Sequence, residues 1–113
     1  MRVIVVGSSD RVDADVIRDE LSTLPLGATI VIGTIADVET TIERVAKELK
    51  FDLEEWEVDT ERDGPRAETI RNQEMVNDGA DLCVAFPTAS CKSTWDCIKR
   101  ARGAQIDTVV VKQ

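Results

Sequence analysis

The chain has 113 residues, with 22 acidic against 14 basic side chains and a formal net charge of -8. This length fits one domain over residues 1–113, and the negative charge argues against a general nucleic-acid binder, which depends on neutralising phosphates. The chain contains no histidine and no tyrosine, so it lacks the commonest general base and the commonest transition-metal ligand.

Targeting segments and metal-binding patterns are not evident in the sequence. No apolar run approaches the roughly 20 residues of a membrane span. The N-terminus has the pattern of a strand and not of a signal peptide. The three cysteines form no CxxC pair, which argues against both a disulfide framework and a metal site. We therefore expect a cytoplasmic protein that uses no metal or other cofactor and binds no membrane.

The first half of the chain alternates strand patterns with helix patterns. β-branched runs over 2–6 and 29–32 predict two strands that are buried on both faces. Each run is followed by apolar residues at helical spacing, first up to position 21 and then over 38–49. Residues 53–58 alternate apolar side chains with glutamates, which predicts an exposed edge strand.

The second half continues the alternation and sets the fold class. After a polar, turn-rich segment over 59–66, the pattern predicts a helix over 67–77, a buried strand over 82–86, a helix closed by Gly103 and a strand over 108–111. This alternation predicts an α/β fold with a five-stranded, mainly parallel, doubly wound sheet and helices on both faces. Such sheets bind ligands at the carboxyl ends of their strands.

The first of the loops at that edge contains Gly7, Ser8, Ser9 and Asp10. Glycine permits a tight turn, and serine hydroxyls beside a helix N-terminus suit a phosphate or a ribose. The alternative is an ordinary turn in which Asp10 or Asp13 caps the following helix.

The loop after the second predicted strand begins with Gly33 and Thr34, which would form a facing wall of the crevice. Asp37 and Glu39 follow. Their carboxylates would either accept hydrogen bonds from ribose hydroxyls or complement the positive end of the next helix dipole.

The last of these loops is rich in hydroxyl groups and contains Ser90, Lys92, Ser93 and Thr94. Lys92 offers a point charge to an anion. The alternative is a capped loop in which Ser93 or Thr94 is the N-cap of the last helix. We expect Trp95 in that helix to contribute to packing and not to stack on a base.

A polar triplet, Arg71-Asn72-Gln73, lies near the start of the helix predicted over 67–77. Arginine presents a rigid fork of donors that matches phosphate or carboxylate, and the two carboxamides can recognise donors and acceptors on a base or ribose. The alternative is an exposed helical turn. The topology places this segment near the crevice.

Four segments resemble motifs of one protein family. Gly7-Ser8-Ser9-Asp10 corresponds to the motif Gly-x-Arg-Asp, and Gly33 corresponds to the first residue of Gly-Gly-Ala-x-Gly-Ala-Asp. The motif Gly-x-x-Ala-Gly-x-x-Arg-Asn-x-x-Met is matched by Gly64, Ala67, Arg71, Asn72 and Met75. The motif Phe-Pro-Gly-Gly-x-Gly-Thr is matched by Phe86-Pro87 and Thr94. Over nearly its full length the chain thus resembles the SLOG superfamily, the Rossmann-like fold of DprA-type proteins and cytokinin-activating LOG enzymes. It is most similar to a small stand-alone YspA-like branch of unknown function, which occurs in bacteria and their phages.

The resemblance implies a pocket for a nucleotide or a nucleotide derivative. Its residues would be Gly7, Ser8, Ser9, Asp10, Gly33, Thr34, Arg71, Asn72, Ser90, Lys92, Ser93 and Thr94. Arg71 would contact phosphate, and Asn72 would order the loop or recognise a polar edge. Because SLOG proteins are often dimers, the resemblance also implies a homodimer.

Three functions follow from the resemblance as expectations. The first is a nucleotide-binding or ligand-sensing protein without catalysis, because side chains replace the glycines that cradle phosphate in the family. The second is a nucleoside N-glycosidase like the LOG enzymes, with a carboxylate from Asp10, Glu39, Glu68 or Asp96. The third is an interaction protein that has lost its ligand.

Overall fold

A computed structural model describes residues 1–8, 10–11, 13–34 and 39–112 of the chain. Within these residues one sheet has the strand order β3-β2-β1-β4-β5, and every neighbouring pair of strands is parallel. The strands are β1 (Arg2–Gly7), β2 (Thr29–Thr34), β3 (Asp52–Glu57), β4 (Leu82–Phe86) and β5 (Asp107–Val110). The predicted α/β fold is confirmed, and the sheet is wholly parallel where a mainly parallel one was expected.

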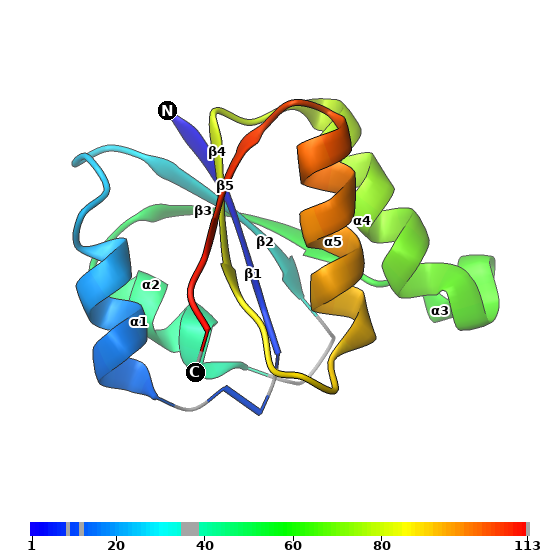
Figure 1. The fold of residues 1–113 in the computed structure, drawn as a ribbon, viewed down its shortest axis with the longest axis horizontal. Helices are drawn as coiled ribbons and strands as arrows, with labels where there is room; N and C mark the ends of the chain where they lie inside the picture. Colours follow the sequence, from blue (N-terminus) through cyan, green and yellow to red (C-terminus); the bar gives the residue numbers. More distant parts are fainter. Residues whose placement is uncertain (9, 12, 35–38, 113) are drawn as a thin grey trace.

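Four main helices cover the two faces of the sheet, as Figure 1 shows. They are α1 (Ala14–Leu21), α2 (Thr41–Glu48), α4 (Ala67–Asp78) and α5 (Lys92–Gly103). α1 and α2 pack on one face, and α4 and α5 pack on the other. This is a Rossmann-like arrangement. None of the described helices is long and apolar enough to cross a membrane.

The sequence of β1 explains why both faces are covered. Val3 and Val5 are fully buried in the core beneath α1 and α2, whereas Ile4 and Val6 belong to the core beneath α4 and α5. Successive side chains of a strand point to opposite faces, so an unbroken apolar run needs cover on both. Each buried aliphatic side chain contributes about 1.5–3 kcal/mol relative to exposure, which makes this central strand a main source of stability.

A short helical segment replaces the turn that the sequence predicted over 59–66. It consists of α3 (Thr60–Asp63) and the 3₁₀ helix η1 (Gly64–Arg66), and it lies at the outer end of α4 (Figure 1). The Asp59 side chain accepts a hydrogen bond of 3.0 Å from the backbone amide of Arg62. This N-cap, a strong local helix signal, is hidden in the sequence by the polar composition around it.

The first turns of the helices differ in part from the predictions. Asp13 is the N-cap residue of α1 but its side chain makes no cap hydrogen bond, since it pairs with Arg11. α5 begins at Lys92 with Cys91 as N-cap, so the prediction of Ser93 or Thr94 as N-cap was wrong. The apolar stripe predicted to begin at residue 38 starts outside the described residues.

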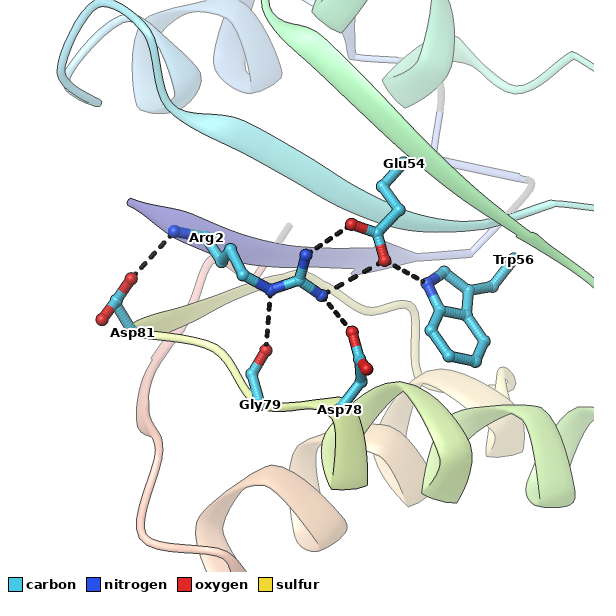
Figure 2. Close-up of polar contacts among 6 residues, drawn as sticks. All are labelled: Arg2, Glu54, Trp56, Asp78, Gly79 and Asp81. Carbon is cyan, nitrogen blue, oxygen red and sulfur yellow. Dashed lines mark hydrogen bonds and ion pairs between the residues drawn. The ribbon is translucent and has the colours of Figure 1, made fainter.

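At the amino end of the sheet, Arg2 joins β1 to β3 and α4, as Figure 2 shows. Its guanidinium pairs with both carboxylate oxygens of Glu54, with Asp78 at 2.6 Å and with the Gly79 carbonyl at 3.1 Å. Glu54 also accepts a hydrogen bond of 3.0 Å from the Trp56 indole. The hydrogen bond from Arg2 holds the pKa of Glu54 below its usual value of 4.5.

We expect Arg2→Met to lower the urea midpoint of unfolding modestly at pH 7. Partly exposed ion pairs contribute little to stability individually and contribute more when several charges form a network. A carboxyl whose folded pKa is lowered contributes stability above its unfolded pKa, and that contribution is lost as pH falls through the folded value. The gap between wild type and variant should therefore narrow below pH 4.5. Urea unfolding at pH 7 and pH 3 measures this difference in stability between wild type and Arg2→Met. A difference that is the same at both pH values contradicts this role of Glu54.

Candidate functional site: a cavity at the carboxyl ends of β1 and β2

A cavity of about 110 Å³ lies where β1 and β2 end, between the beginnings of α2, α4 and α5. Six of the residues predicted for the site line it, namely Gly7, Gly33, Arg71, Asn72, Ser93 and Thr94. They come from four different elements, so the fold brings together segments that are far apart in the sequence. The position agrees with the general location of ligand sites in parallel sheets.

Arg71 lies flat against the backbone of Gly33. A Cβ atom built on Gly33 would be 2.5 Å from Arg71 Cζ and 2.7 Å from its Nε. Real Cβ atoms almost never approach this closely, so a side chain at position 33 would displace the guanidinium. Glycine is therefore needed at this point because of the close approach of Arg71.

The guanidinium of Arg71 is poorly satisfied. One terminal nitrogen donates to the Asn72 side-chain oxygen at 3.2 Å, and the other donates to the Thr34 carbonyl at 3.5 Å, a long contact. The Nε atom is buried and has no hydrogen-bond partner among the described residues. Buried donors are nearly always paired in native proteins, so the unpaired Nε indicates a place where an external acceptor would be stabilised.

Arg71 also has no ion pair with any carboxylate of the described residues. Burial lowers its pKa, while the charge of Glu68, another cavity residue, acts in the opposite direction. An arginine nevertheless remains charged at neutral pH. The cavity thus contains a half-buried positive charge whose main compensation comes from a carboxylate that does not contact it.

Asn72 is buried between helices, with only 1 % of its surface exposed. Its amide nitrogen donates to the Ser93 carbonyl at 3.0 Å and to Asp96 at 3.2 Å, and its oxygen accepts from Arg71. Asn72 therefore ties α4 to α5 and orients Arg71 at the same time. Its neighbour Gln73 accepts a hydrogen bond of 2.7 Å from Arg100 on α5 and does not line the cavity.

The N-terminus of α5 forms another side of the cavity, through Cys91, Ser93 and Thr94. Cys91 makes no side-chain cap hydrogen bond to the helix, and its sulfur lies 3.2 Å from the Thr94 hydroxyl. Burial acts to raise the pKa of the Cys91 thiol, but hydrogen bonds from Ser8 and Thr94 outweigh it and the pKa is lowered. The first amides of a helix carry partial positive charge, so this side also favours a negative group.

The chain has a relative among known proteins by sequence similarity. The chain is 33 % identical over 117 residues to the Gene 61 protein of Mycobacterium phage D29, and the alignment covers 96 % of this chain and 94 % of that protein. The chain belongs to the family of this phage protein. No protein-family model and no solved structure matches it.

The other predicted residues of this phage-family protein that the structure describes do not line the cavity. Ser8 is buried, and its hydroxyl accepts hydrogen bonds from the Thr88 backbone at 3.1 Å and the Thr88 hydroxyl at 3.0 Å. Thr34 contributes its carbonyl to Arg71. Ser90 and Lys92 are exposed, and Ser9 lies outside the described residues.

Of the four carboxylates considered for catalysis, Glu68 alone lines the cavity. Asp10 accepts a hydrogen bond from the Thr88 hydroxyl at 3.2 Å. Glu39 forms an exposed ion pair with Lys47 at 2.8 Å. Asp96 is bound by Asn72 and by Arg100 at 2.9 Å. Asp37, the other acidic residue considered for ribose, lies outside the described residues.

A second cavity carboxylate, Glu43, was not predicted from the sequence. It is 4 % exposed and forms a capping box with Thr40 at the start of α2. Burial raises its pKa, and the hydrogen bond from the Thr40 backbone opposes that shift only in part. The signal was present, because Thr40 and Glu43 have the spacing of a capping box. The described residues contain no cluster of acidic or cysteine side chains that could hold a metal ion.

Proposed function

We propose that this protein binds a nucleotide or nucleotide derivative of the SLOG kind, with an anionic group of the ligand held by Arg71 in the cavity. The observation that carries the proposal is the buried Nε of Arg71, which has no hydrogen-bond partner in the part of the chain that the structure describes. An acceptor beside it would make a charge-assisted hydrogen bond worth about 1.5–3 kcal/mol.

The surroundings of Arg71 support a phosphate-like group as the occupant. The guanidinium is a planar fork that pairs with two oxygens of one group. The N-terminus of α5, which forms another side of the cavity, provides partial positive charge. The resemblance of the segment from Gly64 to Met75 to the SLOG motif agrees with a role of Arg71 in ligand binding.

A thermal-shift screen of nucleoside mono- and diphosphates tests the proposal. A ligand at 100 times its Kd stabilises the folded state by about 2.7 kcal/mol, which corresponds to a rise in Tm of about 10 °C for a chain of this size. We expect at least one nucleotide to produce a shift of this order in the wild type. Arg71→Ala should reduce the affinity about 10- to 100-fold.

The unliganded variant provides a second readout. Arg71→Ala removes a buried Nε donor that has no partner among the described residues, together with the hydrogen bond to Asn72 and the long contact to Thr34. The gain and the loss oppose each other, so the stability without ligand should lie within about 1 kcal/mol of the wild type. Arg102→Ala is the matched control, since Arg102 is an exposed helical arginine without an ion pair among the described residues. A flat response of the wild type across the panel would favour the interaction protein over the binding protein.

A second candidate function is hydrolysis of a nucleoside N-glycosidic bond. The observation that favours it is the presence of Glu43 and Glu68 in the cavity that holds Arg71. Glycosidic hydrolysis commonly uses two carboxyl groups, one of them with a raised pKa that acts as the acid, and the pKa of Glu43 is raised by burial. Hydrolysis would place Glu68 as base or nucleophile near the anomeric carbon.

Release of free base from nucleoside 5′-monophosphates separates hydrolysis from binding. If the protein is a hydrolase, Glu68→Gln should abolish release, whereas Glu39→Gln, at an exposed residue that pairs with Lys47 and does not line the cavity, should retain it. Binding without base release by the wild type would reject catalysis and leave the binding function intact.

A further inference from the structure

The cavity around Arg71 is too small for a whole nucleotide. Its volume is about 110 Å³, whereas pockets that enclose ligands of that size have about 300–1,000 Å³. The cavity has room for a single phosphate-sized group. If the proposed function holds, most of the ligand has to lie beyond the cavity, and the surface next to it decides which ligands fit.

An open groove continues from the cavity along the facing sides of α4 and α5. Its volume is about 450 Å³, and it shares Glu68 and Ser93 with the cavity wall. Thr69 lines it on the α4 side, and Lys92 and Lys99 line it on the α5 side. The groove therefore adjoins the Arg71 cavity directly and has the volume that the cavity lacks.

The α5 side of the groove carries two lysines, which give that side a local positive charge. Lys92 and Lys99 are exposed and form no ion pair with the described residues. Their separation of seven positions places them on the same face of α5, two turns apart. Two carboxylates also line the groove. Asp96 is already paired with Arg100 at 2.9 Å, and Glu68 lies at the boundary with the cavity, where its charge acts on Arg71. Two unpaired lysines on one helix face stand out in a chain of net charge -8.

We infer that the groove is a second anion subsite, so that the preferred ligand is a nucleotide with at least two phosphate groups. One phosphate would lie at Arg71 and the other would lie between Lys92 and Lys99. This inference rests on the proposed function and narrows its ligand class. A nucleoside monophosphate would fill one subsite and leave the lysines unused.

Isothermal titration with the 5′-monophosphates and 5′-diphosphates of adenosine and guanosine tests the inference. We expect the wild type to bind a diphosphate roughly tenfold more tightly than the matching monophosphate. In Lys92→Ala/Lys99→Ala this preference should fall to about twofold or less, while the affinity for the monophosphate stays within about twofold of wild type. Adenosine 3′,5′-bisphosphate is a third ligand, whose two phosphates are attached to different carbons of the ribose. Its affinity relative to the 5′-diphosphate shows whether the two subsites bind separate or consecutive phosphates.

The control variant is Arg44→Ala/Arg102→Ala, which makes the same change in net charge at exposed positions outside the groove. It should keep the preference for the diphosphate or bisphosphate. Equal binding of mono- and diphosphorylated nucleotides by the wild type, or a preference that survives loss of both lysines, would overturn the second subsite and leave the Arg71 site standing. Absence of binding by every nucleotide would overturn both.

Discussion

Arg11→Ala should destabilise the protein by about 3–5 kcal/mol, the largest loss expected for any single substitution considered. Arg11 is fully buried. Its guanidinium donates twice to Asp13 at 2.8 Å and also to the carbonyls of Pro87 at 3.1 Å and Val111 at 2.7 Å. Truncation would leave these carbonyls without donors and would open a cavity beside Phe86, over which the guanidinium lies.

Urea unfolding measures this loss, which is a large part of the 5–15 kcal/mol that is typical of a domain. If Arg11→Ala does not fold, Arg11→Lys provides the measurement, because lysine keeps the charge but cannot supply the fork of donors. Arg102→Ala serves as the exposed control and should lie within about 0.5 kcal/mol of wild type. A loss below 1 kcal/mol for Arg11→Ala would show that the buried network contributes little.

The role of Arg11 was not evident in the sequence, for a physical reason. In the sequence it is a charged residue in a polar loop, a pattern typical of exposed side chains. Its carbonyl partners, Pro87 and Val111, are 76 and 100 positions away. Local patterns carry no information on contacts of that range, so the burial of Arg11 becomes visible only with the tertiary fold.

The strands could be predicted because their signal is local and strong. The run over 3–6 is apolar at every position, and only burial on both faces explains it. The topology then placed Gly33 and Arg71 near the same edge of the sheet. Their direct contact, and the unpaired Nε that it leaves, depend on side-chain positions that no periodicity encodes.

Gly33→Ala should leave the protein folded and reduce nucleotide affinity at least as much as Arg71→Ala, about 10- to 100-fold. The added methyl group would occupy the space of the Arg71 guanidinium and would also project into the cavity wall. The clashing atoms belong to the far end of a flexible side chain, so the backbone need not move. Thermal unfolding without ligand and titration with the nucleotide found in the screen measure the two effects separately.

Substitutions at two other glycines provide comparisons for Gly33→Ala. Gly103→Ala meets no atom within 4 Å and should change neither stability nor affinity appreciably. Gly7→Ala would meet the Ile42 side chain and would come within 3.1 Å of the Phe86 carbonyl oxygen. Since the backbone of β4 cannot yield as a side chain does, Gly7→Ala should destabilise the fold itself by about 1–3 kcal/mol.

The double variant Gly33→Ala/Arg71→Ala decides whether the methyl group acts through Arg71. If it does, the guanidinium is already absent in Arg71→Ala, and adding the methyl should weaken binding by much less than it does in the wild type. The affinity losses would then be clearly less than additive. Fully additive losses would mean that Gly33 contacts the ligand independently, and the close packing of Arg71 on the Gly33 backbone would not be the feature that shapes this site.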